Sequence, residues 1–205
     1  MAIDWVQFRD RTTFILGADK HAGKTTFLKY ALANLRHASC TPGYMSTGID
    51  GEGRDHLSGI AKPTVLAEDG DVVATTESAI TESEGSYEIL QVFEQSTLLG
   101  RPVVATVRRA GLVELIGPGS NRKLGDVISF VREQTPAKAV LIDGAADRVT
   151  QVSAAMRACY VMVLKVTPAT LPRAADRIKL VNMLSDLPPA EADPVSYTHL
   201  TLPTN

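Results

Sequence analysis

The residues with the clearest potential for chemistry lie together near the N-terminus, in a segment that reads ADKHAGKT from Ala18 to Thr25. The segment matches a relaxed form of the pattern G-x-x-x-x-G-K-[ST], with Ala18 in place of the first glycine. In that pattern, small residues let backbone N–H groups turn inward around a β-phosphate, and the lysine supplies a cation to the β- and γ-phosphates. The neighbouring Gly17 does not restore the strict spacing. The segment therefore predicts a loop that holds the phosphates of a nucleoside triphosphate.

Several residues of this loop have an expected role. Lys24 would neutralise phosphate charge in binding and in catalysis, and the Thr25 hydroxyl would ligate Mg²⁺. Thr26 is placed to contact the α-phosphate at a helix N-terminus, where the helix dipole also favours anions. His21 lies inside the loop, and we expect its side chain to point outward without a catalytic role. The predicted phosphate-binding residues are Ala22, Gly23, Lys24, Thr25 and Thr26.

A carboxylate is expected opposite this loop, at the end of a buried strand. The apolar run Ala139–Ile142 leads directly into Asp143, and an acid there would hold Mg²⁺ directly or through water, opposite Thr25. Asp143 could instead cap a helix or a turn, because aspartate is common in both places. Together with the phosphate loop, we favour the metal role. The sequence thus predicts a magnesium site made by Thr25 and Asp143, with Asp143 taking part in catalysis.

A third group should orient the attacking water near the γ-phosphate. The stretch Thr47–Asp55 concentrates acids and glycines around one arginine, so it could move and still present carboxylates. Asp50 is the first choice for this catalytic role because it comes soonest after a predicted strand, Gly43–Ile49. The alternative, that the stretch is a solvated surface loop, stays open.

The choice between ATP and GTP depends on a later segment. Guanine-specific proteins with a phosphate loop usually carry an Asn/Thr-Lys-x-Asp reader after a later strand. The corresponding stretch here, Val163–Pro168, lacks both the amide and the aspartate. We therefore expect ATP, with GTP as the less favoured nucleotide.

Short apolar strands and amphipathic helices alternate along the chain. Strands are expected at Thr12–Leu16, Gly43–Ile49, Ala139–Ile142 and Tyr160–Val166. Helices are expected at Lys24–Leu35, Ser86–Leu98, Leu124–Val131 and Ala174–Leu184. Hairpins are expected from Thr64–Ala67 to Val72–Thr76, around Asp69-Gly70, and from Pro102–Val107 to Leu112–Ile116. The alternation predicts an α/β fold, a three-layer α/β/α phosphate-loop NTPase with a mainly parallel sheet and antiparallel hairpin additions.

Composition and charge limit the classes of partner. The net charge of −2 gives the chain as a whole no attraction to nucleic acid or to an anionic membrane. The longest apolar runs are too short to span a bilayer, and no signal peptide is evident, so we expect a cytoplasmic protein. Cys40 and Cys159 lack metal-type spacing and are interpreted as small buried residues rather than as a disulfide.

The C-terminal end has an unusual composition. Residues 195–205 read VSYTHLTLPTN, without an acid, lysine or arginine, and resemble translated adapter read-through at the end of a shortened reading frame. The alternative is a short polar tail. We expect one nucleotide-binding domain over residues 1–194, truncated at its C-terminus, and a non-native tail over residues 195–205.

Three segments resemble a known family: FILGADKHAGKTTFL, STGIDGEGRD with the following AKPTVLAEDGDVVATT, and AVLIDGAADR. They are similar to the small phosphate-loop subunit of the reactivase of lysine 5,6-aminomutase, a B12- and PLP-dependent enzyme of lysine fermentation. The resemblance covers roughly Thr12–Pro188. It implies that nucleotide binding or hydrolysis helps to restore inactive cobalamin in the mutase, beside a larger chaperone-like subunit.

The resemblance also assigns residues. Gly23, Lys24 and Thr25 match the family's phosphate loop, and Asp50, Glu52 and Asp143-Gly144 match its other motif positions. The chain departs from the family pattern at Thr167-Pro168-Ala169, where Thr-Gly-Ala is expected. No B12-binding Asp-x-His-x-x-Gly is present.

Three functions remain open from the sequence. The leading hypothesis is an ATPase whose output is a conformational change in a partner protein. A second is an ATP-dependent small-molecule enzyme of the dethiobiotin-synthetase type, with Lys62 and Glu114 in a substrate pocket. A third is a nucleotide-binding scaffold with little hydrolysis, in which Asp50 is not catalytic.

Overall fold

The computed structural model describes residues 3–19, 22–47, 64–94, 100–118, 120–144 and 158–186. The chain divides into two compact units, Met1–Lys165 and Val166–Asn205. Asp50, Glu52, Lys62 and His21 lie outside the described residues, so the expectations for them have no structural counterpart here.

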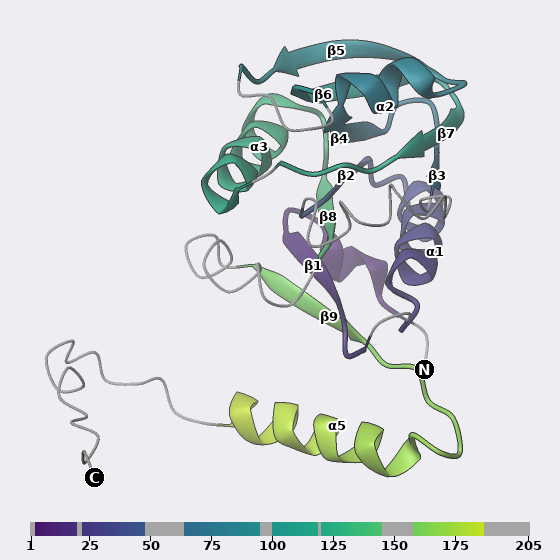
Figure 1. Ribbon diagram of the computed structural model, residues 1–205, viewed down its shortest axis with the longest axis vertical. Coiled ribbons are helices and arrows are strands. Elements are labelled where there is room, and N and C mark those ends of the chain that lie inside the picture. The colour runs from purple at the N-terminus through teal and green to yellow at the C-terminus, as the bar shows by residue number, and fades with distance from the viewer. Residues whose placement is uncertain are drawn as a thin grey trace, which may run out of the picture. The chain divides into compact units, whose positions relative to one another are not determined.

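The first unit is built on a mixed sheet of seven strands in the order β5-β6-β4-β2-β8-β1-β9 (Figure 1). Neighbouring strands from β4 to β9 run parallel, whereas β6 is antiparallel to both β4 and β5. The strands are β1 (Thr12–Gly17), β2 (Pro42–Ser46), β4 (Val72–Thr76), β5 (Ser86–Val92), β6 (Pro102–Arg109), β8 (Ala139–Asp143) and β9 (Cys159–Val163). The α/β class, the mainly parallel sheet and the antiparallel addition at one edge are confirmed.

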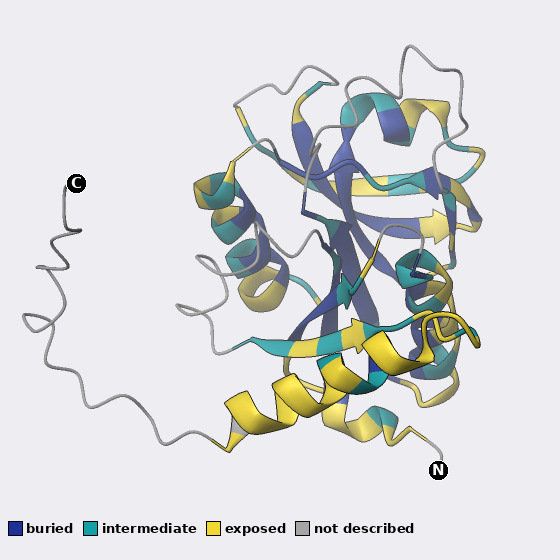
Figure 2. Ribbon diagram, turned by 60° about the horizontal axis from the view of Figure 1, so that its bottom comes forward, coloured by how far each residue is buried: buried dark blue, intermediate teal, exposed yellow. Residues whose placement is uncertain are grey.

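Helices cover both faces of this sheet because each strand alternates its apolar side chains between them. Phe14 packs in the same core cluster as α3 (Asn121–Gln134), and the next residue, Ile15, packs in the cluster of α1 (Lys24–His37). Each helix buries one stripe at helical spacing. The stripe of α1 is Leu28, Ala31, Leu32 and Leu35, and that of α3 is Leu124, Val127, Ile128 and Val131. Figure 2 shows these helices buried on the side that meets the sheet.

The two hairpin predictions are wrong, although the strands themselves are present. β3 (Thr64–Ala67) pairs with β7 (Gly111–Glu114) in a separate antiparallel ribbon, while β4 lies between β2 and β6. Every residue of β4 is buried, and a strand buried on both faces needs a central place in a sheet. The exposed Leu66 of β3 and Leu112 of β7 show that the ribbon keeps one open face. Gly70, with φ +85°, makes the sharp turn between the two sheets.

The helix expected at Ser86–Leu98 is also wrong. Residues 86–92 form the edge strand β5, and residues 95–98 lie outside the described part. The spacing of the apolar residues in this segment fits both a helix and a strand. The segment forms a strand because it pairs with β6. Two short elements were not expected, the 3-10 helix η1 (Trp5–Phe8) and α2 (Glu77–Glu82), which begins after Thr76.

The second unit contains α5 (Leu171–Ser185), which confirms the helix expected at Ala174–Leu184. Many of its large apolar side chains are exposed: Leu171, Ile178, Leu180, Val181, Met183 and Leu184. Within the described residues, no helix combines the length and the apolar composition needed to cross a membrane.

Both cysteines are free thiols. Cys40 is buried as expected, and burial raises the pKa of its thiol. Cys159 is only partly buried, and its sulfur accepts a hydrogen bond from the Arg11 guanidinium at 3.4 Å.

Candidate functional site

The predicted phosphate loop connects the end of β1 to the start of α1. Gly23 precedes the helix with φ +102°, a left-handed conformation that glycine adopts without a steric penalty. Glycine also has no side chain that could cap the amides of Lys24, Thr25 and Thr26, which lack helical acceptors. Upstream, the N–H of Ala22 donates a hydrogen bond to the Asp19 carbonyl at 3.2 Å. A helix that starts in this way, with no side-chain cap, suits an anion.

Gly17 has a steric role that the sequence pattern did not reveal. A Cβ placed on Gly17 would lie 3.0 Å from Cγ and 3.1 Å from Cδ of Lys24. The hydrocarbon part of the Lys24 side chain therefore runs back over the end of β1, across the loop that precedes it. The same Cβ would lie 3.2 Å from the Asp19 carbonyl oxygen, so a larger residue here would force the lysine side chain to shift by a few tenths of an ångström. In the sequence, the only sign of this role was that a small residue stands at the end of the strand. The spacing of the motif had instead suggested that Gly17 was unimportant.

The structure brings Thr25 and Asp143 together, as the sequence predicts. Asp143 ends β8, which lies beside β1 with Asp143 in register with Ile15. The Thr25 hydroxyl donates a hydrogen bond to Oδ2 of Asp143 at 3.0 Å, and the contact is partly buried. A helix residue and a strand residue 118 positions apart in the sequence thus share one small site.

The end of β2 reaches the same place from the other side of β8. Ser46 is in register with Asp143, and the N–H of Thr47 donates to the Asp143 carbonyl at 2.9 Å. Thr47 is only 3% exposed. It is the first residue of the stretch predicted to orient water, so that stretch starts beside Asp143, although Asp50 itself lies outside the described residues. The carboxyl ends of three parallel strands therefore meet here, where open α/β sheets bind ligands.

The donor set at this place suits Mg²⁺. The Thr25 hydroxyl and the Asp143 carboxylate provide two oxygen ligands, and Mg²⁺ is usually held by one or two carboxylates together with water and substrate phosphates. Among the described residues, no group of three or more His, Cys, Asp or Glu side chains is placed to hold a metal. A metal here would take most of its ligands from water and from a bound phosphate group.

A partly buried ionic cluster holds the other end of α1. The Arg36 guanidinium donates to Asp71 at 2.5 Å and 3.2 Å and to Glu68 at 2.7 Å, and the Tyr44 hydroxyl donates to Asp71 at 3.0 Å. Burial lowers the pKa of Arg36 while its bonds to Asp71 raise it, and the net pKa lies above the usual value. Burial, followed by the Asp71 charge, raises the pKa of Tyr44 well above its usual value. The cluster fixes α1 against the turn between β3 and β4.

Glu114, the substrate-pocket candidate of the small-molecule hypothesis, ends β7 near the same edge of the sheet. Its backbone carbonyl accepts a hydrogen bond from the Thr75 hydroxyl at 2.7 Å, and the same hydroxyl accepts from the N–H of Ile116 at 3.1 Å. Thr75 lies near the carboxyl end of β4. The start of the chain after β7 therefore lies near the carboxyl end of β4, two strand positions from β8 and three from β1.

Comparisons with protein-family models, with curated proteins and with solved structures found no match to this chain. The chemistry of the site must be inferred from its own residues. A lysine beside a helix N-terminus, with a hydroxyl and a carboxylate in contact, is suited to a phosphate chain and its divalent cation.

Proposed function

We propose that this chain is a phosphate-loop nucleotide-binding protein that takes ATP with Mg²⁺ and acts as an ATPase. The observation that carries the proposal is the 3.0 Å hydrogen bond from Thr25 to Asp143, made beside the glycine-preceded start of α1. A phosphate loop needs a hydroxyl and an acid at one place for its metal, and these two residues come from distant parts of the sequence.

In this proposal each residue has a defined task. The amides that follow Gly23 bind phosphate oxygens, and Lys24 places its charge near the β- and γ-phosphates. Thr25 and Asp143 hold Mg²⁺, which neutralises phosphate charge when it is bound. We further propose that Asp50 orients the attacking water, since the stretch that contains it begins at Thr47, hydrogen-bonded to Asp143.

ATP is favoured over GTP because the segment that follows β9 lacks the guanine reader. β9 lies beside β1, and the N–H of Ala18 donates to the carbonyl of Val163, the last residue of β9, at 3.1 Å. A base-reading segment after β9 would therefore start next to the phosphate loop. The residues that follow, Leu164–Pro168, offer neither the amide nor the aspartate that guanine requires.

The biological role in the proposal comes from the sequence resemblance. We propose that the chain is the small subunit of a reactivase, working in the cytoplasm with a larger subunit on a cobalamin-dependent aminomutase of the lysine 5,6-aminomutase type. Its ATPase cycle would drive a conformational change in those partners. Addition of the partners should then stimulate hydrolysis, whereas a nucleotide-binding scaffold would show little hydrolysis with or without them.

A second candidate is an ATP-dependent small-molecule enzyme of the dethiobiotin-synthetase type. The position of Glu114 favours it, because the Thr75–Glu114 hydrogen bond puts that residue at the edge of the sheet that also carries Asp143. This candidate requires turnover that depends on a small acid and needs no partner protein. Hydrolysis that responds only to partner proteins would exclude it.

Calorimetry with Mg-ATP and Mg-GTP tests the proposal directly. Lys24→Ala should weaken triphosphate binding by about a hundredfold or more, because a charge-assisted contact to two phosphates is lost. Lys29→Ala is the matched control, since Lys29 is an exposed lysine of the same helix outside the loop. Equal ATP affinities for Lys24→Ala and Lys29→Ala would refute the phosphate-loop assignment.

A further inference from the structure

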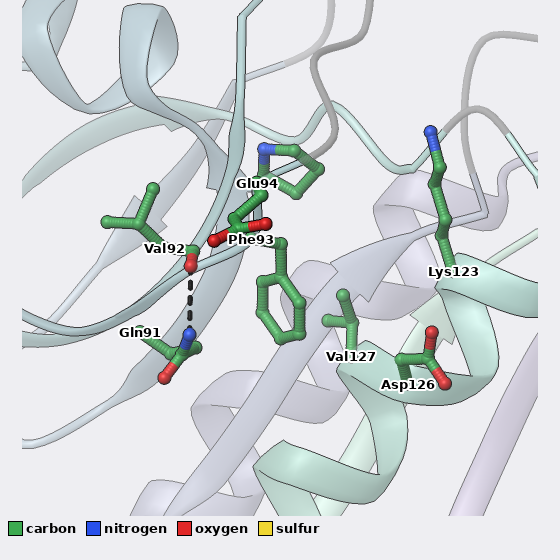
Figure 3. Close-up of a pocket in the computed structure, with 8 residues that line it drawn as sticks. Gln91, Val92, Phe93, Glu94, Lys123, Asp126 and Val127 are labelled. Carbon is green, nitrogen blue, oxygen red and sulfur yellow. Dashed lines mark hydrogen bonds between the residues drawn. The ribbon is translucent and has the colours of Figure 1, made fainter.

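A cavity of about 390 Å³ lies between the end of β5, the start of β6 and the first turns of α3 (Figure 3). Its volume falls in the range of small-molecule sites, roughly 300–1,000 Å³. No residue of this cavity belongs to the phosphate loop or to the Thr25–Asp143 pair. The cavity is therefore a candidate for a second site.

The cavity opens at the same edge of the sheet as the nucleotide site, but at a distance from it. Pro102, which lines the cavity, is in register with Thr76, the last residue of β4. β6 and β8 are separated by three strand positions, which at about 4.8 Å each is about 14 Å. Reacting atoms must approach to about 3.5 Å. A ligand confined to this cavity would therefore not exchange a phosphoryl group with a nucleotide at the loop.

The floor of the cavity is apolar and already assembled. Phe93 and Val127 face each other across it in Figure 3. The N–H of Phe93 donates to the Pro102 carbonyl at 2.9 Å, and its ring meets Phe130 edge-on with centroids 6.1 Å apart. These contacts fix the ring, so an aliphatic group could bind against it without prior rearrangement.

The walls carry three charged side chains of both signs. Glu94 comes from the strand side, whereas Lys123 and Asp126 come from α3 and extend in different directions (Figure 3). Within the described part of the chain, none of these three charged groups takes part in an ion pair. Other charges, such as Arg101 with Glu77, are paired at 2.7 Å. A ligand that spans the cavity could therefore place a cation at Glu94 and an anion at Lys123, on opposite sides of the apolar floor (Figure 3).

We propose that this cavity binds a small aliphatic zwitterion, with a primary ammonium group at one end and a carboxylate at the other. The ammonium group faces Glu94 on the strand side, the carboxylate faces Lys123 on α3, and the hydrocarbon chain lies between them on Phe93 and Val127. This site is independent of the nucleotide site.

Three probes of matched length test the assignment on the full chain by two-dimensional NMR titration. 5-Aminopentanoate should bind most tightly, and pentylammonium and pentanoate should each bind about tenfold more weakly, because each loses one charge-assisted contact. Glu94→Gln should weaken 5-aminopentanoate binding by about tenfold and abolish its advantage over pentanoate, and Lys123→Met should abolish its advantage over pentylammonium. These side chains are exposed or only half-buried, so the variants should fold.

The control variant is Glu133→Gln, which removes the same charge from an exposed residue near the far end of α3. It should leave the binding of all three probes unchanged. Lys24→Ala should also bind 5-aminopentanoate normally, so a failed nucleotide site and a failed second site give different results. The proposal is overturned if 5-aminopentanoate shows no saturable shifts, if pentanoate binds as tightly, or if Glu133→Gln weakens 5-aminopentanoate binding as much as Glu94→Gln does.

Discussion

Removing the guanidinium of Arg36 should strongly destabilise the fold. In Arg36→Met the hydrocarbon part is largely kept, but Asp71 loses its cation while its side chain stays only 2% exposed. Breaking a buried ion pair by removing one partner costs about 3–5 kcal/mol. Domains typically unfold with only about 5–15 kcal/mol, so the variant should lose a large part of its stability.

Urea denaturation followed by circular dichroism measures this loss. The midpoint of Arg36→Met should fall with little change in slope, since the folded surface is otherwise retained. Arg101→Met is the control, because Arg101 pairs with Glu77 at the surface and both side chains are more than a third exposed. Pairs of that kind contribute little, so its midpoint should stay close to that of the original chain.

A second variant separates the charge effect from simple loss of packing. Arg36→Met combined with Asp71→Asn no longer buries an uncompensated carboxylate, and the amide oxygen introduced by the second substitution can still accept from Tyr44. The double variant should be more stable than the sum of the two single effects predicts. Our interpretation would be refuted if Arg36→Met cost less than about 1 kcal/mol, or if the two substitutions were simply additive.

Three further predictions concern the site and the pH profile. Gly17→Ala should weaken Mg-ATP binding about tenfold without unfolding the chain, because a Cβ 3.0 Å from Lys24 Cγ forces the lysine side chain to shift from its position. Calorimetry that finds unchanged ATP affinity would contradict this prediction. Asp143→Asn should remove most of the Mg²⁺ dependence of ATP binding, measured by titrations with Mg²⁺ and with EDTA, and an unaltered Mg²⁺ effect would refute the metal role. The raised pKa of Tyr44 keeps its hydroxyl protonated in the fold, so its contribution is complete below the unfolded pKa of about 10 and is lost as the pH rises through the folded pKa. Above a pH of about 10, the free energy of unfolding should therefore fall more steeply in the original chain than in Tyr44→Phe, by about 1.4 kcal/mol per pH unit. Urea denaturation at a series of pH values measures this difference. Parallel pH profiles of the two proteins would contradict the prediction.

Local patterns in the sequence were sufficient for the elements that position the site. The apolar runs at β1 and β8 and the helical stripe of α1 have unambiguous periods, and each forms the expected element. The predicted phosphate loop lies between a strand and a helix, with Gly23 directly before the helix. Asp143 was identified for a similar reason, as an acid that directly follows a buried run.

Local sequence patterns did not reveal which strands pair with one another. The strands of both predicted hairpins exist, but β4 takes a central place because all its residues are buried, while β3 joins β7 outside the main sheet. The segment 86–92 became a strand because β6 offered an open edge, which no property of the segment itself encodes. Strand order depends on contacts between distant segments, and such contacts are invisible to a local pattern.

By itself, the sequence determined which residues could hold phosphate and metal, since that depends on residue type and on spacing within short segments. The tertiary structure alone decided that Thr25 meets Asp143 at 3.0 Å, that Gly17 makes room for Lys24, and that a charged cavity forms between β5 and α3. The physical reason is that parallel pairing of β1 with β8 and with β9 aligns the carboxyl ends of strands far apart in the chain. Only that alignment turns separate motifs into one site.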